Sequence, residues 1–273
     1  MRKTKSLLIS TPYILWMLVF TLIPLGVVGY YALTDPDTGA LTLNNMAQIV
    51  EYLPVLWKSI CYSLISAFIC LLMGYPVAYF IAHRGPTAQK ILYMLVMLPM
   101  CMSFLLRTLA WVGLLQDTGI INTLLGKLGI GPIPMIRTPG AVILGMVYNY
   151  LPYMILPLYA IIVKIDPRLI EAAEDLGCNG FQTFKKVTLP LSMPGILSGI
   201  TMVFVPAVST FYISQKLGGT ETLLIGDVIE RQFKQAYNPN VGAALSLVLM
   251  ALVFICTGIM NRLGGDEEGG VVV

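Results

Sequence analysis

The chain has 273 residues, of which 57% are hydrophobic and 11% are charged, and its formal net charge is +3. No soluble core could bury so much apolar surface, so the composition excludes a soluble globular domain and predicts an all-α polytopic membrane protein. The small net charge, spread over the loops, also argues against a nucleic-acid partner.

Six long apolar runs predict six transmembrane helices, since about 20 residues cross a hydrocarbon layer of roughly 30 Å. The first run follows Arg2, Lys3 and Lys5 and ends in Tyr30-Tyr31 instead of small residues, so we expect a retained span and not a signal peptide. The predicted spans are residues 7–31, 59–82, 91–115, 138–163, 192–213 and 241–260. Residues 1–262 should form a single transmembrane domain, and residues 263–273 a disordered tail.

Lysine and arginine are more frequent in those connecting segments that are cytosolic if the N-terminus is inside. By the positive-inside rule, both termini are therefore expected on the cytosolic side of the membrane. The same orientation places the loop at 164–190 on the cytosolic side.

The loop at 164–190 is the longest charged passage of the chain. Asp166-Pro167 is a helix-start signal, and Gly177 stands where a left-handed C-cap would end the helix. A second helix is expected from Phe181 to Thr188, ending before Pro190. Carboxylates in the last turn of the first helix are unfavourable by up to about 1 kcal/mol, which indicates a basic external partner. A solvated loop helix between two spans is the alternative.

The loop also carries a recognisable pattern: Glu171-Ala172-Ala173, three residues, Gly177, nine residues, then Val187-Thr188-Leu189-Pro190. This resembles the EAA loop of MetI-like ABC importer permeases, in which an isoleucine stands where this chain has Val187. The resemblance implies a coupling helix presented to a cytosolic ATPase. The residues implied in coupling are Glu171, Ala172, Ala173, Asp175, Gly177, Leu189 and Pro190.

Residues 7–262 further resemble the B-type permeases of bacterial spermidine/putrescine importers. The passages that carry this resemblance are Pro99–Arg107, Thr138–Ile143 with Leu151-Pro152, Met193–Ile196, Phe211–Ser214 and Gly218–Gly226. It implies a multi-pass permease that works by alternating access with a C-type permease, two ATPase subunits and an extracytoplasmic polyamine-binding protein. The implied substrate is a linear polyamine.

The sequence contains no phosphate-binding loop, and it offers little support for a catalytic site. Its nearest approach to a phosphate-binding loop is Gly126-Lys127, without the upstream glycine, so we expect no cofactor here and ATP with Mg²⁺ on the partner ATPase. The single histidine, His83, is expected at a membrane interface. The five cysteines form no C-x-x-C pair, which argues against a disulfide framework or a metal site.

Arg107 is a charge inside the third apolar run, where insertion costs roughly 2.5–3.5 kcal/mol. It should face a cavity or a partner, or else reach the outer interface, and pairing with Asp117 would be the most economical role. For the substrate pathway we hypothesise that Asp117, Glu221 and Asp227 admit the polycation. Trp111 and Tyr148 would offer aromatic faces to it.

Other functions are also compatible with the sequence. A permease of the same fold could carry ferric iron, thiamine or an anion. A stand-alone secondary transporter or channel would need carboxylates inside its spans, and a scaffold would not need the loop pattern.

Gly195 and Gly199, like Gly242 and Ser246, have the small-xxx-small spacing of close helix contacts and would suit packing against a second subunit.

Overall fold

The computed structural model describes residues 11–13, 15–35, 38–236 and 238–264. The basic residues Arg2, Lys3 and Lys5 lie outside these ranges, as do residues 265–273 of the predicted disordered tail (263–273). The first two residues of that tail belong to the last helix, so the prediction is wrong there. Within them the chain is helical, and its one β-bridge pairs Thr34 with Leu41. Contacts divide the chain into two compact units, Met1–Pro54 with Val228–Leu252 and Val55–Asp227 with Val253–Val273.

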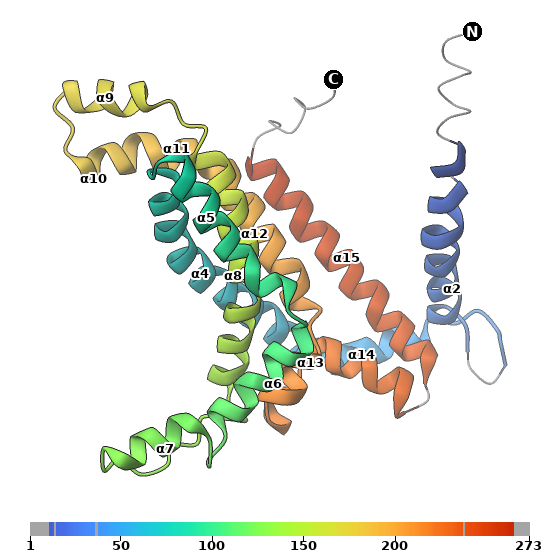
Figure 1. The fold of residues 1–273 in the computed structure, drawn as a ribbon. Coiled ribbons are helices and arrows are strands. Elements are labelled where there is room, and N and C mark those ends of the chain that lie inside the picture. The colour runs from blue at the N-terminus through green and yellow to red at the C-terminus, as the bar shows by residue number, and fades with distance from the viewer. Residues whose placement is uncertain (1–10, 14, 36–37, 237, 265–273) are drawn as a thin grey trace, which may run out of the picture. The chain divides into compact units, whose positions relative to one another are not determined.

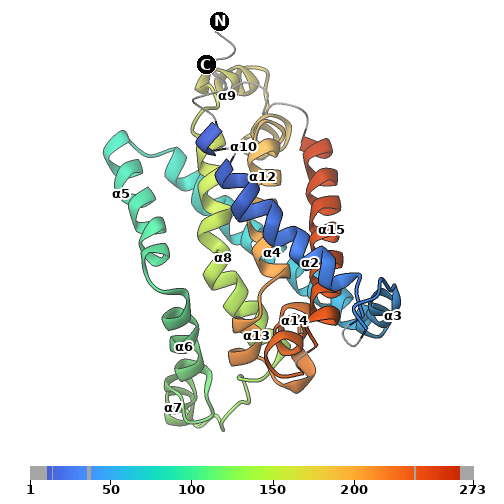
Figure 2. The same cartoon turned by 90° about the vertical axis from the view of Figure 1, so that its right-hand side faces the viewer.

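The helices follow one another with short connections (Figures 1 and 2). The α-helices are α2 (Ile23–Ala32), α3 (Asn44–Gln48), α4 (Leu53–Ala82), α5 (Pro86–Met97), α6 (Phe104–Leu115), α7 (Ile120–Lys127), α8 (Pro139–Ile162), α9 (Pro167–Asp175), α10 (Gly180–Thr183), α11 (Leu189–Leu191), α12 (Met193–Val208), α13 (Tyr212–Leu217), α14 (Ile225–Lys234) and α15 (Pro239–Gly264). Two π-helical segments, η1 (Leu18–Leu22) and η4 (Phe184–Thr188), join this series, as do three short 3-10 turns, η2 (Ile49–Tyr52), η3 (Leu98–Cys101) and η5 (Thr220–Thr222).

Five helical stretches of the described chain are long and apolar enough to cross a membrane: 11–32, 44–82, 104–127, 139–162 and 239–260. A sixth candidate is the pair Gly180–Leu191 and Met193–Val208, which is bent by 63° at Ser192. The third predicted span (residues 91–115) is not one continuous helix, contrary to the prediction. It consists of α5, the 3-10 turn at Leu98–Cys101 and α6, with extended backbone at Met102. Pro99 lacks a backbone N–H, which explains why the helix loosens at this point.

The core of the larger unit is built on the contact between α8 and α12 (Figure 1). Gly195 and Gly199 are buried there. A Cβ at Gly195 would lie 3.1 Å from the Pro157 carbonyl oxygen, and one at Gly199 would lie 2.6 Å from the sulfur of Met154. These glycines therefore permit close packing inside this chain, and our interpretation of them as a contact with a second subunit is wrong.

The smaller unit is held together by buried asparagines. Asn45 donates hydrogen bonds to the carbonyl oxygens of Ala32 (3.2 Å) and Thr34 (2.8 Å), and Asn240 donates to the same Thr34 oxygen (2.5 Å). Gly242 packs against the ring of Phe233, so this glycine also makes its close contact within its own unit. Satisfying buried backbone carbonyls in this way fixes the loop that follows α2.

Candidate functional site

The helix of the predicted EAA loop (residues 164–190) is α9, and its two ends are made as the sequence indicated. The side chain of Asp166 accepts a hydrogen bond from the Arg168 N–H at 3.0 Å, which satisfies one free donor of the first turn. At the other end Gly177 has φ +85°. Gly177 N–H donates to the Glu174 oxygen (2.9 Å) and Cys178 N–H to the Ala173 oxygen (3.1 Å), the bond pair of a Schellman motif.

The solvent-facing surface of α9 and the turn that follows it carry four of the seven predicted coupling residues. Glu171, Ala172, Asp175 and Gly177 are exposed, while Ala173 is buried beneath them. Apolar side chains accompany the acids: Leu176 is 86% exposed and Phe181 74% exposed. Such a surface is compatible with a protein contact.

The return segment of the loop runs from α10 through the π-helical Phe184–Thr188 into α11. Asn179 and Gln182 form a capping box at its start, with bonds of 2.9 and 3.0 Å. The helix then passes through Pro190 to Leu191, so the predicted end before Pro190 is wrong. Proline is tolerated in this position because the wider π-turn that precedes it changes the hydrogen-bond register, and Pro190 lies in the first turn of α11.

The return segment is attached to α4 near the bend at Ser192. The Phe184 ring packs edge-on against Tyr75, with centroids 5.5 Å apart, and against Tyr79 at 6.3 Å. Leu189 is half-buried and Pro190 exposed on the same segment. The sequence places Phe184 on one side of the second loop helix and Ser192 at the start of the fifth span, but it does not reveal that both contact Tyr75. Ser192 makes no side-chain cap bond to α12.

The predicted aromatic pair of the substrate pathway is brought together. Trp111 on α6 and Tyr148 on α8 meet edge to face, with ring centroids 5.4 Å apart. The acids predicted for the substrate pathway are not bonded to this aromatic pair. Within the described chain, neither Trp111 nor Tyr148 makes a hydrogen bond with Asp117 or Asp227. Asp117 is exposed in the turn after α6, and Glu221 lies in the 3-10 turn Thr220–Thr222.

Asp227 has a different position from the one expected of a surface acid. It is 1% exposed, and its Oδ2 accepts a hydrogen bond from the Leu224 N–H at 2.8 Å at the start of α14. Its neighbour Ile225 donates its N–H to the hydroxyl of Ser59 on α4 at 2.7 Å. These bonds secure the start of α14 in the larger unit.

Arg107 is buried on α6, with 6% of its surface exposed. Its Nε and Nη1 atoms have no hydrogen-bond partner among the described residues. The structure does not pair it with Asp117, which lies beyond the far end of the same helix.

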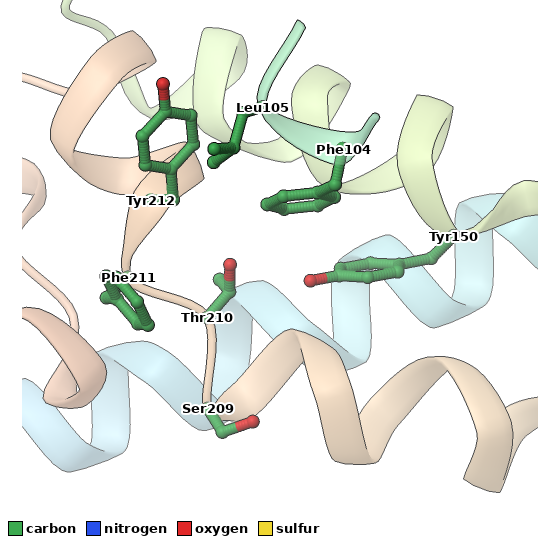
Figure 3. Close-up of a pocket in the computed structure, with 7 residues that line it drawn as sticks. All are labelled: Phe104, Leu105, Tyr150, Ser209, Thr210, Phe211 and Tyr212. Atoms are coloured by element: carbon green, nitrogen blue, oxygen red, sulfur yellow. The ribbon is translucent and has the colours of Figure 1, made fainter. Parts of the chain in front are cut away.

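A pocket of about 310 Å³ opens where α12 ends and the chain runs without helical structure to α13 (Figure 3). It is lined by Phe104, Leu105, Tyr150, Ser209, Thr210, Phe211 and Tyr212. The Tyr150 hydroxyl donates to the Pro206 carbonyl oxygen at 3.3 Å, which ties α8 to the last turn of α12. The sequence analysis includes Phe104, Leu105, Phe211 and Tyr212 in passages that carry the family resemblance, but it does not bring the lining residues together as a site. The signal that could have revealed them is the polar pair Ser209-Thr210 inside an apolar run.

The comparisons with known proteins agree with this geometry. A family model described as "Binding-protein-dependent transport system inner membrane component" matches residues 74–264. The chain belongs to this family. As a binding-protein-dependent inner membrane component it is a multi-pass transport subunit and not itself an enzyme.

Two relatives of this inner membrane component are similar over nearly their full lengths. One is the spermidine/putrescine transport system permease protein PotB of Haemophilus influenzae, 41% identical over 260 residues that cover 91% of each chain. The protein of the same name from Escherichia coli (strain K12) is 38% identical over 243 residues, which cover 86% of this chain and 88% of that protein.

Solved structures share the fold of this inner membrane component at low sequence identity. A chain of a bacterial ABC transporter involved in the import of the acidic polysaccharide alginate matches with a TM-score of 0.81, at 17% identity and with 98% of this chain and 99% of that chain covered. A chain of the inward-facing MetNI methionine ABC transporter matches with a TM-score of 0.61, at 17% identity and with coverage of 80% and 96%. These matches confirm the predicted all-α permease fold.

Proposed function

We propose that this chain is the permease subunit of an ATP-driven importer of linear polyamines, spermidine and putrescine among them. It would form half of the translocation pathway. The observation that carries the proposal is α9: a helix with defined ends that presents Glu171, Ala172 and Asp175 outward beside exposed apolar side chains.

The EAA loop would couple the chain to a cytosolic ATPase. Closure of an ATPase dimer around ATP would move α9 as a rigid lever, and the return segment would pass this motion to α12 through the bend at Ser192. The permease pair would then alternate between inward-open and outward-open states. Contacts of Phe184 with Tyr75 and Tyr79 support this, because they join the return segment to α4.

The complete transporter would contain a C-type permease, two ATPase subunits and an extracytoplasmic polyamine-binding protein. ATP and Mg²⁺ would be bound by the ATPase subunits, and this chain would bind no cofactor. Both termini would be cytosolic. In the larger unit α9 lies at the opposite end from α7, which supports an arrangement with the EAA loop on one side of the membrane and α7 on the other (Figure 2).

The names of the relatives from Haemophilus influenzae and Escherichia coli support polyamines as the substrate class. The paired rings of Trp111 and Tyr148 suit an alkylammonium ion, since each cation–π contact contributes roughly 0.5–2 kcal/mol. An anion or ferric iron would favour other ligands, basic or oxygen-rich, around the pathway. A stand-alone secondary transporter would have no use for an exposed α9.

Reconstitution tests the proposal. The complete complex in proteoliposomes is expected to accumulate tritiated spermidine only with ATP and the binding protein, and spermidine should stimulate its ATPase activity. Thiamine, ferric citrate and sulfate serve as matched alternative substrates. Stimulation by one of these and not by spermidine would overturn the substrate class, and accumulation by this chain alone would overturn the coupling.

A further inference from the structure

The pocket at the end of α12 has an unusual combination of linings. Four of its seven lining residues are aromatic (Phe104, Tyr150, Phe211 and Tyr212), two more carry aliphatic hydroxyls (Ser209 and Thr210), and none of the seven is charged. Phe104 and Tyr212 approach with ring centroids 6.2 Å apart. In Figure 3 the rings of Phe104 and Tyr150 and the hydroxyl of Thr210 face the same space.

This lining matches the chemistry of a linear polyamine. Such a molecule alternates runs of methylene groups with ammonium groups. Aromatic rings can cover the methylenes and remove their apolar surface from water. Hydroxyls and ring faces can accept the ammonium hydrogens. A volume of about 310 Å³ is at the lower end of the range typical of small-molecule sites.

Two cationic side chains, those of Arg107 and Lys216, neighbour residues that line the pocket. Arg107 follows Phe104 by three residues on α6, so the two side chains share one face of the helix. It is buried, and its Nε and Nη1 atoms have no hydrogen-bond partner among the residues that the structure describes. Lys216 adds a second cation, 5.7 Å from the centroid of the Tyr212 ring. A bound ammonium group would feel repulsion from both.

We propose that this pocket is a transient subsite for the methylene chain of a linear polyamine, and that Arg107 keeps its affinity low. A translocation site must bind strongly enough to admit its substrate and weakly enough to release it. Aromatic rings without carboxylates supply the attraction, and the buried guanidinium limits it. This inference rests on the proposed function, and it adds the place of the substrate and the residue that sets its release.

The attraction is tested on the complete complex in nanodiscs, without the binding protein, by equilibrium binding of tritiated spermidine. Phe104→Leu keeps an apolar side chain but removes the ring, and it is expected to weaken binding about threefold to tenfold. Tyr212→Leu serves as a second variant. Phe254→Leu is the matched control, because Phe254 is 68% exposed on α15 and does not line the pocket. Equal binding by all three variants and the wild type would overturn the subsite.

The release function is tested with Arg107→Gln, which removes the charge and keeps polar atoms. Spermidine should bind roughly threefold to tenfold more tightly, while ATP-driven uptake should become slower. Arg107→Lys keeps the charge and should bind spermidine as the wild type does. A purely structural arginine would instead give weaker binding and slower uptake in both variants, and that result would overturn the electrostatic role.

Failure of this inference can be told from failure of the proposed function. A wild-type complex that accumulates spermidine while Phe104→Leu and Tyr212→Leu behave like Phe254→Leu retains the function and loses the subsite. A wild-type complex that imports another substrate and no polyamine loses both.

Discussion

The hydroxyl of Tyr75 lies 2.8 Å from the hydroxyl of Ser192, at the bend where the EAA loop joins α12. Ser192 donates its own proton to the Leu189 carbonyl oxygen at 3.0 Å, so Tyr75 is the donor in the pair. Both side chains are buried. The bond fixes the position of the bend against α4, on the route from the coupling helix into the spans.

Tyr75→Phe removes this bond and keeps the ring that packs against Phe184. We expect a loss of about 1 kcal/mol of stability and a larger relative effect on coupling, with less spermidine imported for each ATP hydrolysed. Parallel assays of uptake and ATP hydrolysis in proteoliposomes measure this. Tyr93→Phe is the matched control, because the Tyr93 hydroxyl makes no hydrogen bond within the described part of the chain. An unchanged ratio in Tyr75→Phe would show that the bond does not transmit motion.

Gly177 is the residue that ends the coupling helix. Its φ of +85° is unfavourable for other residues by about 1–2 kcal/mol, and more for a β-branched one. Gly177→Val should therefore distort the end of α9 and reduce the amount of ATPase that co-purifies with the permease. Gly177→Asn, which tolerates this conformation, should retain most of it. Equal co-purification in the two variants would contradict a role for the shape of this turn.

Gly199 allows α12 to approach α8 closely. A Cβ there would meet the Met154 sulfur at 2.6 Å and the Met154 carbonyl oxygen at 3.3 Å, so a large side chain cannot be accommodated without separating the helices. Gly199→Leu should lower stability by roughly 1–3 kcal/mol, measured as a lower thermal unfolding temperature in detergent. Gly258→Leu on α15, where no atom lies within 4 Å, should have little effect. Comparable destabilisation of both would argue against this packing.

Asn122 secures the loop after α7. It donates to the carbonyl oxygens of Gln116 (3.2 Å) and Ile133 (3.0 Å) and accepts from the Ile133 N–H (2.9 Å). Asn122→Ala removes all three bonds, at about 1–3 kcal/mol, and should speed amide hydrogen exchange over residues 128–136. Asn44→Ala, at an exposed asparagine, provides the comparison. If exchange in the loop does not change, the bonds at Asn122 do not hold it.

Local signals in the sequence were sufficient for the ends of individual helices. Asp166-Pro167 and Gly177 act through backbone bonds to their near neighbours, so the residue types alone predict α9. The fourth run was also anticipated closely, since α8 is capped by Thr138, which accepts from Ala141 N–H at 3.2 Å.

Features that depend on distant contacts escaped the sequence analysis. The interruption of the third run at residues 98–103 and the continuation of a helix through Pro190 both depend on how the backbone is satisfied by surrounding structure. The partners of Gly195 and Gly199 could not be known either, since a small residue fits a neighbouring helix of the same chain and that of another chain equally well. For Arg107 the sequence left a cavity, a partner and the outer interface open. That its Nε and Nη1 atoms have no hydrogen-bond partner among the described residues is visible only in three dimensions.

The most direct test of the account is ATP-driven spermidine uptake by the complete complex carrying Glu171→Lys, a charge reversal at the exposed surface of α9. Glu51→Lys, at an exposed carboxylate outside the EAA loop, is the control. The account predicts that Glu171→Lys inserts normally but loses most of its uptake, and that Glu51→Lys transports like the wild type. Wild-type uptake by Glu171→Lys, with the same ATPase attached, would contradict it.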